Sequence, residues 1–238
     1  MSGELHVLCA GAVQGLVKAL QQRFLAANGT AIQARFGAVG EMREALLGGT
    51  ACDVLIVTEA MLRALRDEGA VAAEPVALIG RVRTGVAVRL GEPVPRVDSA
   101  AALTAALLAA PEIFVPDTKQ STAGRHMAAV LEKLGIAGDT RAKLAVFANG
   151  ATAMKALAER GAPGSLGCTQ VTEILYTQGL SLAGAMPGPL GLSTVYAAGV
   201  GKAATEPALA AAFIALLCGD AAATDRAGGG FEPLVPEF

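Results

Sequence analysis

Apolar residues in the N-terminal part of the chain alternate between short continuous runs and stretches with helical spacing. The run Leu5–Cys9 predicts a buried strand, and from Val13 to Asn28 apolar residues recur every three or four positions, which predicts a helix. The unit recurs, with strands expected at 32–36 and 54–58 and helices expected to include 42–47 and 59–68. Such alternation is typical of a parallel sheet covered by helices, so we expect an α/β fold.

The pattern changes after Gly80, where two strands, 76–79 and 84–89, follow one another without a helix and a loop rich in proline and glycine comes next. A second alternating series then begins. Its expected strands are 113–115, 144–147 and 166–168, and its expected helices are 99–109, 123–134 and 151–160. A loop is expected at 184–191, and the strand 194–200 and the helix 208–218 that follow it return the chain to the first lobe. We predict a discontinuous first lobe, residues 1–80 with 194–238, and an inserted second lobe, residues 81–193.

Composition and charge exclude several classes of function. The chain carries 19 Lys and Arg against 21 Asp and Glu, a net charge of -2, with no basic run of the kind that nucleic acid requires. Four scattered cysteines and two histidines show no metal-ligand spacing, so neither a metal nor a cofactor is expected. The longest apolar stretch, 208–218, is too short for membrane insertion. No basic region precedes Lys18, which predicts a cytoplasmic protein, or a periplasmic one whose leader was removed.

Three expected strands end in small-residue loops that lead directly into helices. The loops are Ala10-Gly11-Ala12, Gly37-Ala38-Val39-Gly40 and Gln120-Ser121-Thr122-Ala123-Gly124. The unpaired N–H groups and the positive dipole end of a helix N-terminus favour an anion, and small side chains let a ligand reach the backbone. Each loop alone is typical of an ordinary turn, and the combination predicts a small anionic ligand.

The order of these motifs resembles the bacterial molybdate-binding protein family of solute-binding proteins. The segments that carry the resemblance are 7–13, 36–40, 52–56, 122–126, 167–174 and 230–233. The resemblance implies the type II periplasmic-binding-protein fold, in which two α/β lobes joined by crossover strands close on a ligand in the cleft between them. Members of the family present one serine hydroxyl from each of the first two loops, and the matching positions here are Ala12 and Val39. Loss of either donor should cost about 1–3 kcal/mol with a tetrahedral oxyanion, which favours a larger di- or tricarboxylate.

The same fold family includes leaderless relatives and aconitate isomerase, so the resemblance also implies a possible enzyme that moves a double bond in an unsaturated carboxylate. Proton transfer would need an acid and a base, and His126 and Glu173 are the candidate pair. We expect His126 in the first turn of a helix, where the dipole favours neutral imidazole. A structural role, capping or solvated, is the alternative for both residues.

The alternative function is non-catalytic: a solute-binding protein of an ABC importer, for molybdate or another anion, or a cytoplasmic sensor. An ABC permease is an expected partner only if a leader is missing from the sequence. Further residues could hold the anion by charge, by hydrogen bonding or through the backbone. The expected charged groups are Arg81, Arg83, Lys119 and Arg125, with Asp117 as a further acid or base, and the remaining ligand contacts are Gly11, Ala12, Ala38, Val39, Thr58, Gln120, Ser121, Thr122, Thr169 and Gln170.

Overall fold

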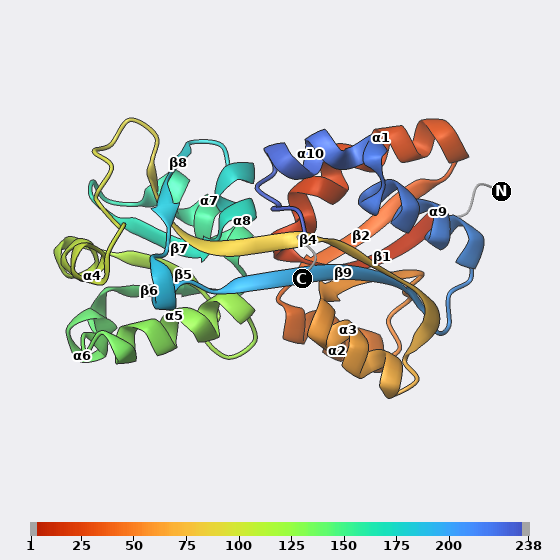
Figure 1. The fold of residues 1–238 in the computed structure, drawn as a ribbon, viewed down its shortest axis with the longest axis horizontal. Helices are drawn as coiled ribbons and strands as arrows, with labels where there is room; N and C mark the ends of the chain where they lie inside the picture. Colours follow the sequence, from red (N-terminus) through yellow and green to blue (C-terminus); the bar gives the residue numbers. More distant parts are fainter. Residues whose placement is uncertain (1–3, 235–238) are drawn as a thin grey trace. The chain divides into compact units, whose positions relative to one another are not determined.

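The computed structural model describes residues 4–234, apart from the side chains of 73–75, and Figure 1 shows their helices and strands. The described chain forms two compact units. Unit 1 runs to Arg81 and resumes at Thr194, and unit 2 is Val82–Ser193. Among the described residues no single helix is long and apolar enough to cross a membrane; Pro207–Cys218 and Asp220–Gly228 reach that length only together, across a 56° bend.

Unit 1 is built on a sheet in the order β2-β1-β3-β9, with β4 beside β9. Its strands are β1 (Glu4–Ala10), β2 (Ala31–Gly37), β3 (Val54–Thr58), β9 (Ser193–Gly201) and the first part of β4 (Val71–Arg89). Its helices are the 3-10 turn η1 (Gly11–Val13), α1 (Gln14–Asn28), α2 (Val39–Leu47), α3 (Glu59–Asp67), α9 (Pro207–Cys218), the 3-10 turn η4 (Asp220–Ala222) and α10 (Ala223–Gly228). Strand β1 pairs in parallel with β2 and β3, whereas β9 runs antiparallel to β3.

Helix α1 shows why the N-terminal pattern folds as predicted. Its apolar positions place Leu16, Val17, Leu20 and Phe24 on the buried face. The Phe24 ring packs edge-on against Phe213 of α9, with ring centroids 5.1 Å apart. The helix ends where Gly29 adopts φ 67, a left-handed conformation that glycine enters without steric cost.

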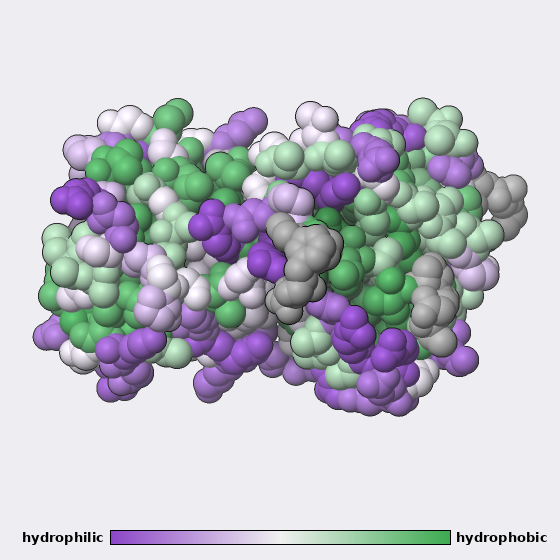
Figure 2. Space-filling view, viewed as in Figure 1, coloured by the Kyte–Doolittle hydropathy of each residue, from purple (hydrophilic) through white to green (hydrophobic). Residues whose placement is uncertain are grey.

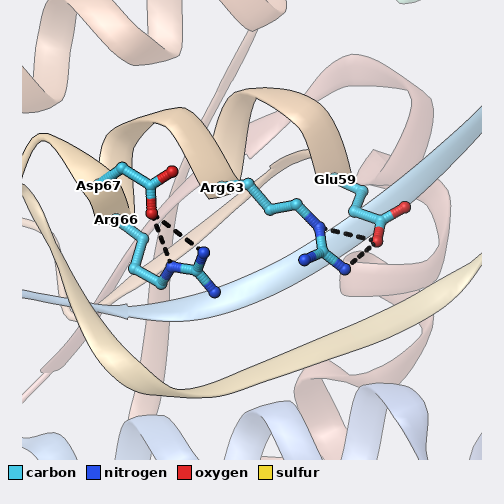
Figure 3. Close-up of polar contacts among 4 residues, drawn as sticks. All are labelled: Glu59, Arg63, Arg66 and Asp67. Atoms are coloured by element: carbon cyan, nitrogen blue, oxygen red, sulfur yellow. Dashed lines mark hydrogen bonds and ion pairs between the residues drawn. The ribbon is translucent and has the colours of Figure 1, made fainter.

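The outer face of α3 carries ion pairs. Arg63 binds Glu59 one turn earlier at 2.6 Å, and Arg66 binds Asp67 at 3.0 Å (Figure 3). Hydrophilic side chains gather over α2 and α3 in the space-filling view (Figure 2). Exposed pairs of this kind contribute about 0–1 kcal/mol, so this face keeps α3 solvated and adds little stability.

Unit 2 has a sheet in the order β4-β7-β5-β6, with β8 also paired to β4. The strands are β5 (Ile113–Pro116), β6 (Leu144–Phe147), β7 (Leu166–Gln170) and β8 (Leu180–Ala185). The helices are α4 (Ala100–Ala109), α5 (Thr122–Lys133), α6 (Ala137–Thr140), the 3-10 turn η2 (Arg141–Lys143), α7 (Gly150–Arg160), α8 (Val171–Tyr176) and the 3-10 turn η3 (Gly188–Leu190). Strand β5 is parallel to β6 and β7, so the loops after all three leave the same edge of the sheet.

Two sequence predictions are corrected by the fold. The strands expected at 76–79 and 84–89 are one continuous strand, β4, because residue Arg81 continues the extended backbone and exchanges two hydrogen bonds with Glu232, at 3.0 and 2.7 Å. The loop expected at 184–191 begins inside β8, whose sequence Leu-Ser-Leu-Ala-Gly-Ala lacks the β-branched residues that mark strands. The short helices α6, α8 and α10 were not predicted, because they span only four to six residues.

Candidate anion site

The two small-residue loops of unit 1 lie side by side. The register of β1 and β2 pairs Ala10 with Gly37, so both strands end together at one edge of the sheet. Strand β1 leads into η1 and β2 leads through Ala38 into α2. No side chain caps the start of η1, α1 or α2, since the residues at the N-cap positions are Ala10, Val13 and Ala38. Two neighbouring helix N-termini therefore keep backbone N–H groups that no capping side chain satisfies.

The walls of these loops are apolar and buried. Gly11 is buried, and Ala12, Ala38 and Val39 are each 5% exposed. These four residues offer a ligand backbone N–H groups and no polar side chain, and the helix dipoles supply partial positive charge there. The arrangement can bind an anion without a cationic side chain.

One acidic residue that sequence reasoning missed lies in the first turn of α2. The Glu41 carboxylate accepts a hydrogen bond from Arg35 at 2.9 Å and packs against the Gly37 backbone. A carboxylate in a first turn interacts favourably with the helix dipole, and the Arg35 guanidinium offsets its charge. Its signal in the sequence is the Glu at the third position of α2, where acidic residues are favoured.

The Thr58 hydroxyl and the Arg81 backbone are engaged elsewhere in unit 1. The Thr58 hydroxyl accepts the Met61 N–H at 3.3 Å and caps α3. The backbone of Arg81 pairs with Glu232, as described above. Strand β3 pairs with β1, so Thr58 ends a strand beside the Gly11 loop, and its hydroxyl is already used as a helix cap.

In unit 2 the loop after β5 is held by its own polar groups. The Asp117 carboxylate accepts the N–H groups of Lys119 and Gln120, both at 2.7 Å, and these two bonds hold the pKa of Asp117 below its ordinary value. Ser121 caps α5 through the Gly124 N–H at 3.4 Å. The Arg125 guanidinium donates to the Lys119 carbonyl at 2.9 Å. Asp117, Ser121 and Arg125 thus stabilise the loop itself, while Gln120 and Thr122 flank the start of the helix.

The sequence predicted His126 in the first turn of its helix, and this prediction is wrong. Helix α5 begins at Thr122, so His126 is its fifth residue and lies beyond the first turn. Its Nε2 lies 2.8 Å from the Leu190 carbonyl oxygen. A carbonyl can only accept, so Nε2 carries the proton and neutral His126 has its lone pair on Nδ1. The ring thereby joins α5 to η3, whose last residue is Leu190.

A buried acid, Glu173 in the first turn of α8, contacts its hydrogen-bond donors at the end of β7. Thr169, Gln170 and Glu173 are 1%, 2% and 6% exposed. The Glu173 carboxylate accepts the Thr169 hydroxyl at 2.5 Å and the backbone N–H groups of Gln170 and Ala151. Burial raises the pKa of Glu173 to about 7, and the three hydrogen bonds oppose that rise. Glu173 is therefore hydrogen-bonded at the start of α8, whereas His126 is hydrogen-bonded to Leu190.

The start of α7 completes this cluster. Asn149 and Thr152 form a reciprocal capping box, and the Ala151 N–H in the same turn goes to Glu173. A Cβ atom at Gly150 would collide with both the Glu173 carboxylate and the Thr169 hydroxyl. Gly150 is therefore required by close packing, a role that the Asn149-Gly150 pair signals in the sequence only as a turn.

Arg83 is exposed on β4, next to buried Val82. The described residues contain no group of three or more His, Cys, Asp or Glu side chains able to hold a metal ion. The structure thus brings the predicted contacts together in two sets. The first set is Gly11, Ala12, Ala38 and Val39 in unit 1; the second comprises the loops after β5, β6 and β7 in unit 2, with Gln120, Ser121, Thr122, Thr169, Gln170 and Glu173.

Comparisons with known proteins agree with this architecture. The family model for bacterial extracellular solute-binding proteins matches residues 5–232. No curated protein sequence matches the chain. The periplasmic molybdate-binding protein of Azotobacter vinelandii superimposes with a TM-score of 0.80 at 19% identity, covering 98% of this chain and 100% of that one.

Two further solved structures are similar. The sulfate-binding protein SubI of Mycobacterium tuberculosis H37Rv gives a TM-score of 0.74 at 18% identity, covering 99% of this chain and 88% of that one. PEB3 with bound L-phospholactate gives 0.69 at 14% identity, covering 97% and 100%. These similarities confirm the predicted type II periplasmic-binding-protein fold and the resemblance to molybdate-binding proteins.

Proposed function

Because the chain belongs to the family of bacterial extracellular solute-binding proteins, we propose that it is the solute-binding component of an ABC importer and binds a small anion. The observation that carries this proposal is the pair of adjacent, uncapped helix N-termini at Gly11–Ala12 and Ala38–Val39. The family description favours the periplasmic alternative over the cytoplasmic location expected from the N-terminal sequence.

The ligand class follows from what the loops offer. Ala12 and Val39 provide no hydroxyl, so a compact oxyanion is held by backbone N–H groups alone at these positions. Solved relatives are described as binding molybdate or sulfate and, in one case, L-phospholactate, which carries carbon as well as charge. The apolar, buried walls suit an anion with a carbon skeleton, and we propose an organic carboxylate or a related small organic anion as the ligand.

Wild-type protein should show a rise in melting temperature with the ligand class that it binds, because a ligand specific for the folded state stabilises it. We expect a di- or tricarboxylate, tested as succinate and citrate, to bind at least about tenfold more tightly than molybdate or sulfate in calorimetry, a difference of roughly 1.4 kcal/mol. Tight molybdate binding without any response to carboxylates would contradict the ligand class and leave the solute-binding function intact. No response to any of these anions would contradict the function itself.

Ala38→Asp tests whether the α2 N-terminus is the anion site. The backbone of Ala38 already has N-cap geometry, with φ -68 and ψ 152, so a carboxylate there can accept the first-turn N–H groups. We expect higher stability without ligand, by about 0.5–2 kcal/mol, and at least about tenfold weaker anion binding, because the side chain competes with the ligand.

A variant that gains stability while it loses anion affinity has lost the affinity through competition at the site, because a damaged fold would lose both. Ser99→Ala is the matched control. The Ser99 hydroxyl caps α4 by accepting the Ala102 N–H at 3.2 Å, and the substitution removes this cap. It should lower stability by about 0.5–2 kcal/mol and leave anion affinity unchanged. If Ala38→Asp bound the anion as tightly as wild type, α2 would not be part of the site.

One observation favours a second candidate function, an isomerase acting on an unsaturated carboxylate. The pKa of Glu173, raised by burial to about 7, suits a group that takes up and returns a proton near neutral pH. If Glu173 and His126 transfer protons, solvent deuterium should enter the allylic carbon of bound aconitate, and Glu173→Gln should slow that exchange by about 10²–10⁴-fold. A substrate that binds but gains no deuterium would exclude this activity and leave the importer component.

A further inference from the structure

Glu173 is a buried acid, and in the described part of the chain no charged side chain forms an ion pair with it. Burial raises its pKa, and the three hydrogen bonds that it accepts lower the pKa. The titratable residues on the elements around it have other environments. Cys168 of β7 is buried and its pKa is raised to about 12, whereas on α7 Lys155 pairs with Glu159 at the surface and Arg160 stacks over Phe114 and Phe147. Tyr176, at the end of α8, is 41% exposed.

The hydrogen bond between Thr169 and Glu173 can run in either direction. An ionised carboxylate can only accept, so the Thr169 hydroxyl must then donate its one hydrogen to Glu173. Its oxygen can only accept from any other group. A protonated carboxyl can donate instead, which releases the Thr169 hydrogen for a different acceptor.

The packing keeps these two side chains together in both states. Gly150 leaves room for the carboxylate against the start of α7, and the Ala151 and Gln170 N–H groups hold it from two sides. The distance between Thr169 Oγ1 and Glu173 Oε2 is 2.5 Å, and both side chains are buried. Exchange of the proton therefore reverses the bond without a change of neighbours.

We propose that Glu173 is a positioning residue of unit 2, which decides through the direction of its bond with Thr169 whether the end of β7 offers an anionic ligand a hydrogen-bond donor or only an acceptor. The inference rests on the proposed function, that the chain binds a small anion, and on the expectation from the sequence that Thr169 and Gln170 contact this ligand. With Glu173 ionised, the site favours an anion that still carries a hydroxyl or an acidic proton. With Glu173 protonated, it also favours a fully deprotonated oxyanion, which can only accept.

Sulfate is the probe of choice, because its charge does not change across the pH range in which Glu173 titrates. For wild-type protein we expect sulfate affinity to fall by about tenfold or more from about pH 5.5 to about pH 8.5, as Thr169 loses its free hydrogen and Glu173 gains charge. Glu173→Gln supplies an N–H that can donate to Thr169 at every pH. Its sulfate affinity should be independent of pH and should exceed that of wild type by about tenfold at the higher pH.

Thr169→Val removes the hydroxyl and should bind sulfate weakly, with less pH dependence than wild type. Glu159→Gln is the matched control on α7, since the Glu159 carboxylate is exposed and pairs with Lys155, and this variant should keep the wild-type profile. A wild-type pH profile in Glu173→Gln, or a flat profile in wild-type protein that binds sulfate, would overturn the inference.

Measuring the free energy of unfolding against pH needs no ligand, so it tests the pairing of Glu173 with Thr169 independently of anion binding. The folded-state pKa of Glu173 lies above its unfolded value, so its contribution to stability is present below about pH 4.5 and is lost as the pH rises through about 7. Glu173→Gln should lack this loss. If that difference appears while no anion binds to wild type, the proposed function fails and the Glu173 pairing stands; if the pH dependence of stability is the same in both proteins, the pairing fails.

Discussion

Asp53→Asn is expected to lower the free energy of unfolding by about 3 kcal/mol, although the change removes only one charge and keeps the shape of the side chain. Asp53 is 1% exposed and is surrounded by donors. One carboxylate oxygen accepts the His6 N–H at 2.8 Å, and the other accepts from the N–H and hydroxyl of Thr205 and from the Glu206 N–H, at 2.8, 3.1 and 3.2 Å. An asparagine must turn its NH₂ group toward N–H donors in either orientation.

The connections of Asp53 explain why the effect should be large. His6 lies in β1, Asp53 precedes β3, and Glu206 is the N-cap residue of α9, which has no side-chain cap of its own. One carboxylate thus joins the sheet of unit 1 to the start of a core helix. Calorimetric or denaturant unfolding measures the loss, and Asp98→Asn is the control, because the Asp98 ion pair with Arg96 is exposed and should contribute about 0–1 kcal/mol.

The same residue gives a pH dependence with a definite sign. Burial alone would raise the pKa of Asp53, but the N–H groups of His6, Glu206 and Thr205 and the Thr205 hydroxyl hold it below its ordinary value. A carboxyl group with a lowered folded-state pKa contributes stability above its unfolded pKa, near 4, and loses it as the pH falls through the folded pKa. The difference in free energy of unfolding between wild type and Asp53→Asn should therefore be smaller in acid than at neutral pH. An equal difference at neutral and acid pH would show that packing, not ionisation, causes the loss.

Periodicity was sufficient to predict the longer elements, and it failed where backbone hydrogen bonds decide. Helix α1 and strand β3 follow from their apolar spacing. The continuity of β4 through Gly80 depends on pairing of Arg81 with Glu232, which is distant in the chain, and no local pattern reports it. Strand β8 depends on pairing with β4, because its own residues have little strand preference.

The candidate site shows a similar division. The small-residue loops after β1 and β2 could be identified because a strand, a glycine and a helix are visible in order along the chain. The sequence could not show that the side chains of Thr58, Ser121 and Asp117 accept hydrogen bonds from nearby backbone N–H groups. Capping depends on where each helix begins to within one residue. His126 illustrates the sensitivity: a helix start at Thr122 places it beyond the first turn and removes the dipole argument made for it.

Gly124→Ala should destabilise the protein by about 2–4 kcal/mol, whereas helix propensity alone would predict a gain of about 1 kcal/mol. Gly124 is the third residue of α5 and is buried against the end of β5. A Cβ atom there would collide with the backbone carbonyl oxygens of Asp117 and Pro116. These are backbone atoms, and the same Asp117 carbonyl accepts the Ser121 N–H at 3.1 Å, so α5 cannot move away without losing that bond.

Gly138→Ala is the control that reverses the sign. Gly138 lies in α6 of the same unit and a Cβ atom would meet nothing within 4 Å, so only propensity acts and stability should stay equal or rise by up to about 1 kcal/mol. Because Gly124 follows Gln120, Ser121 and Thr122, its replacement should also weaken anion binding if the start of α5 contacts the ligand. Denaturant unfolding of both variants measures the stability of each. If Gly124→Ala were as stable as Gly138→Ala, the close contact of Gly124 with the end of β5 would not fix α5 in place.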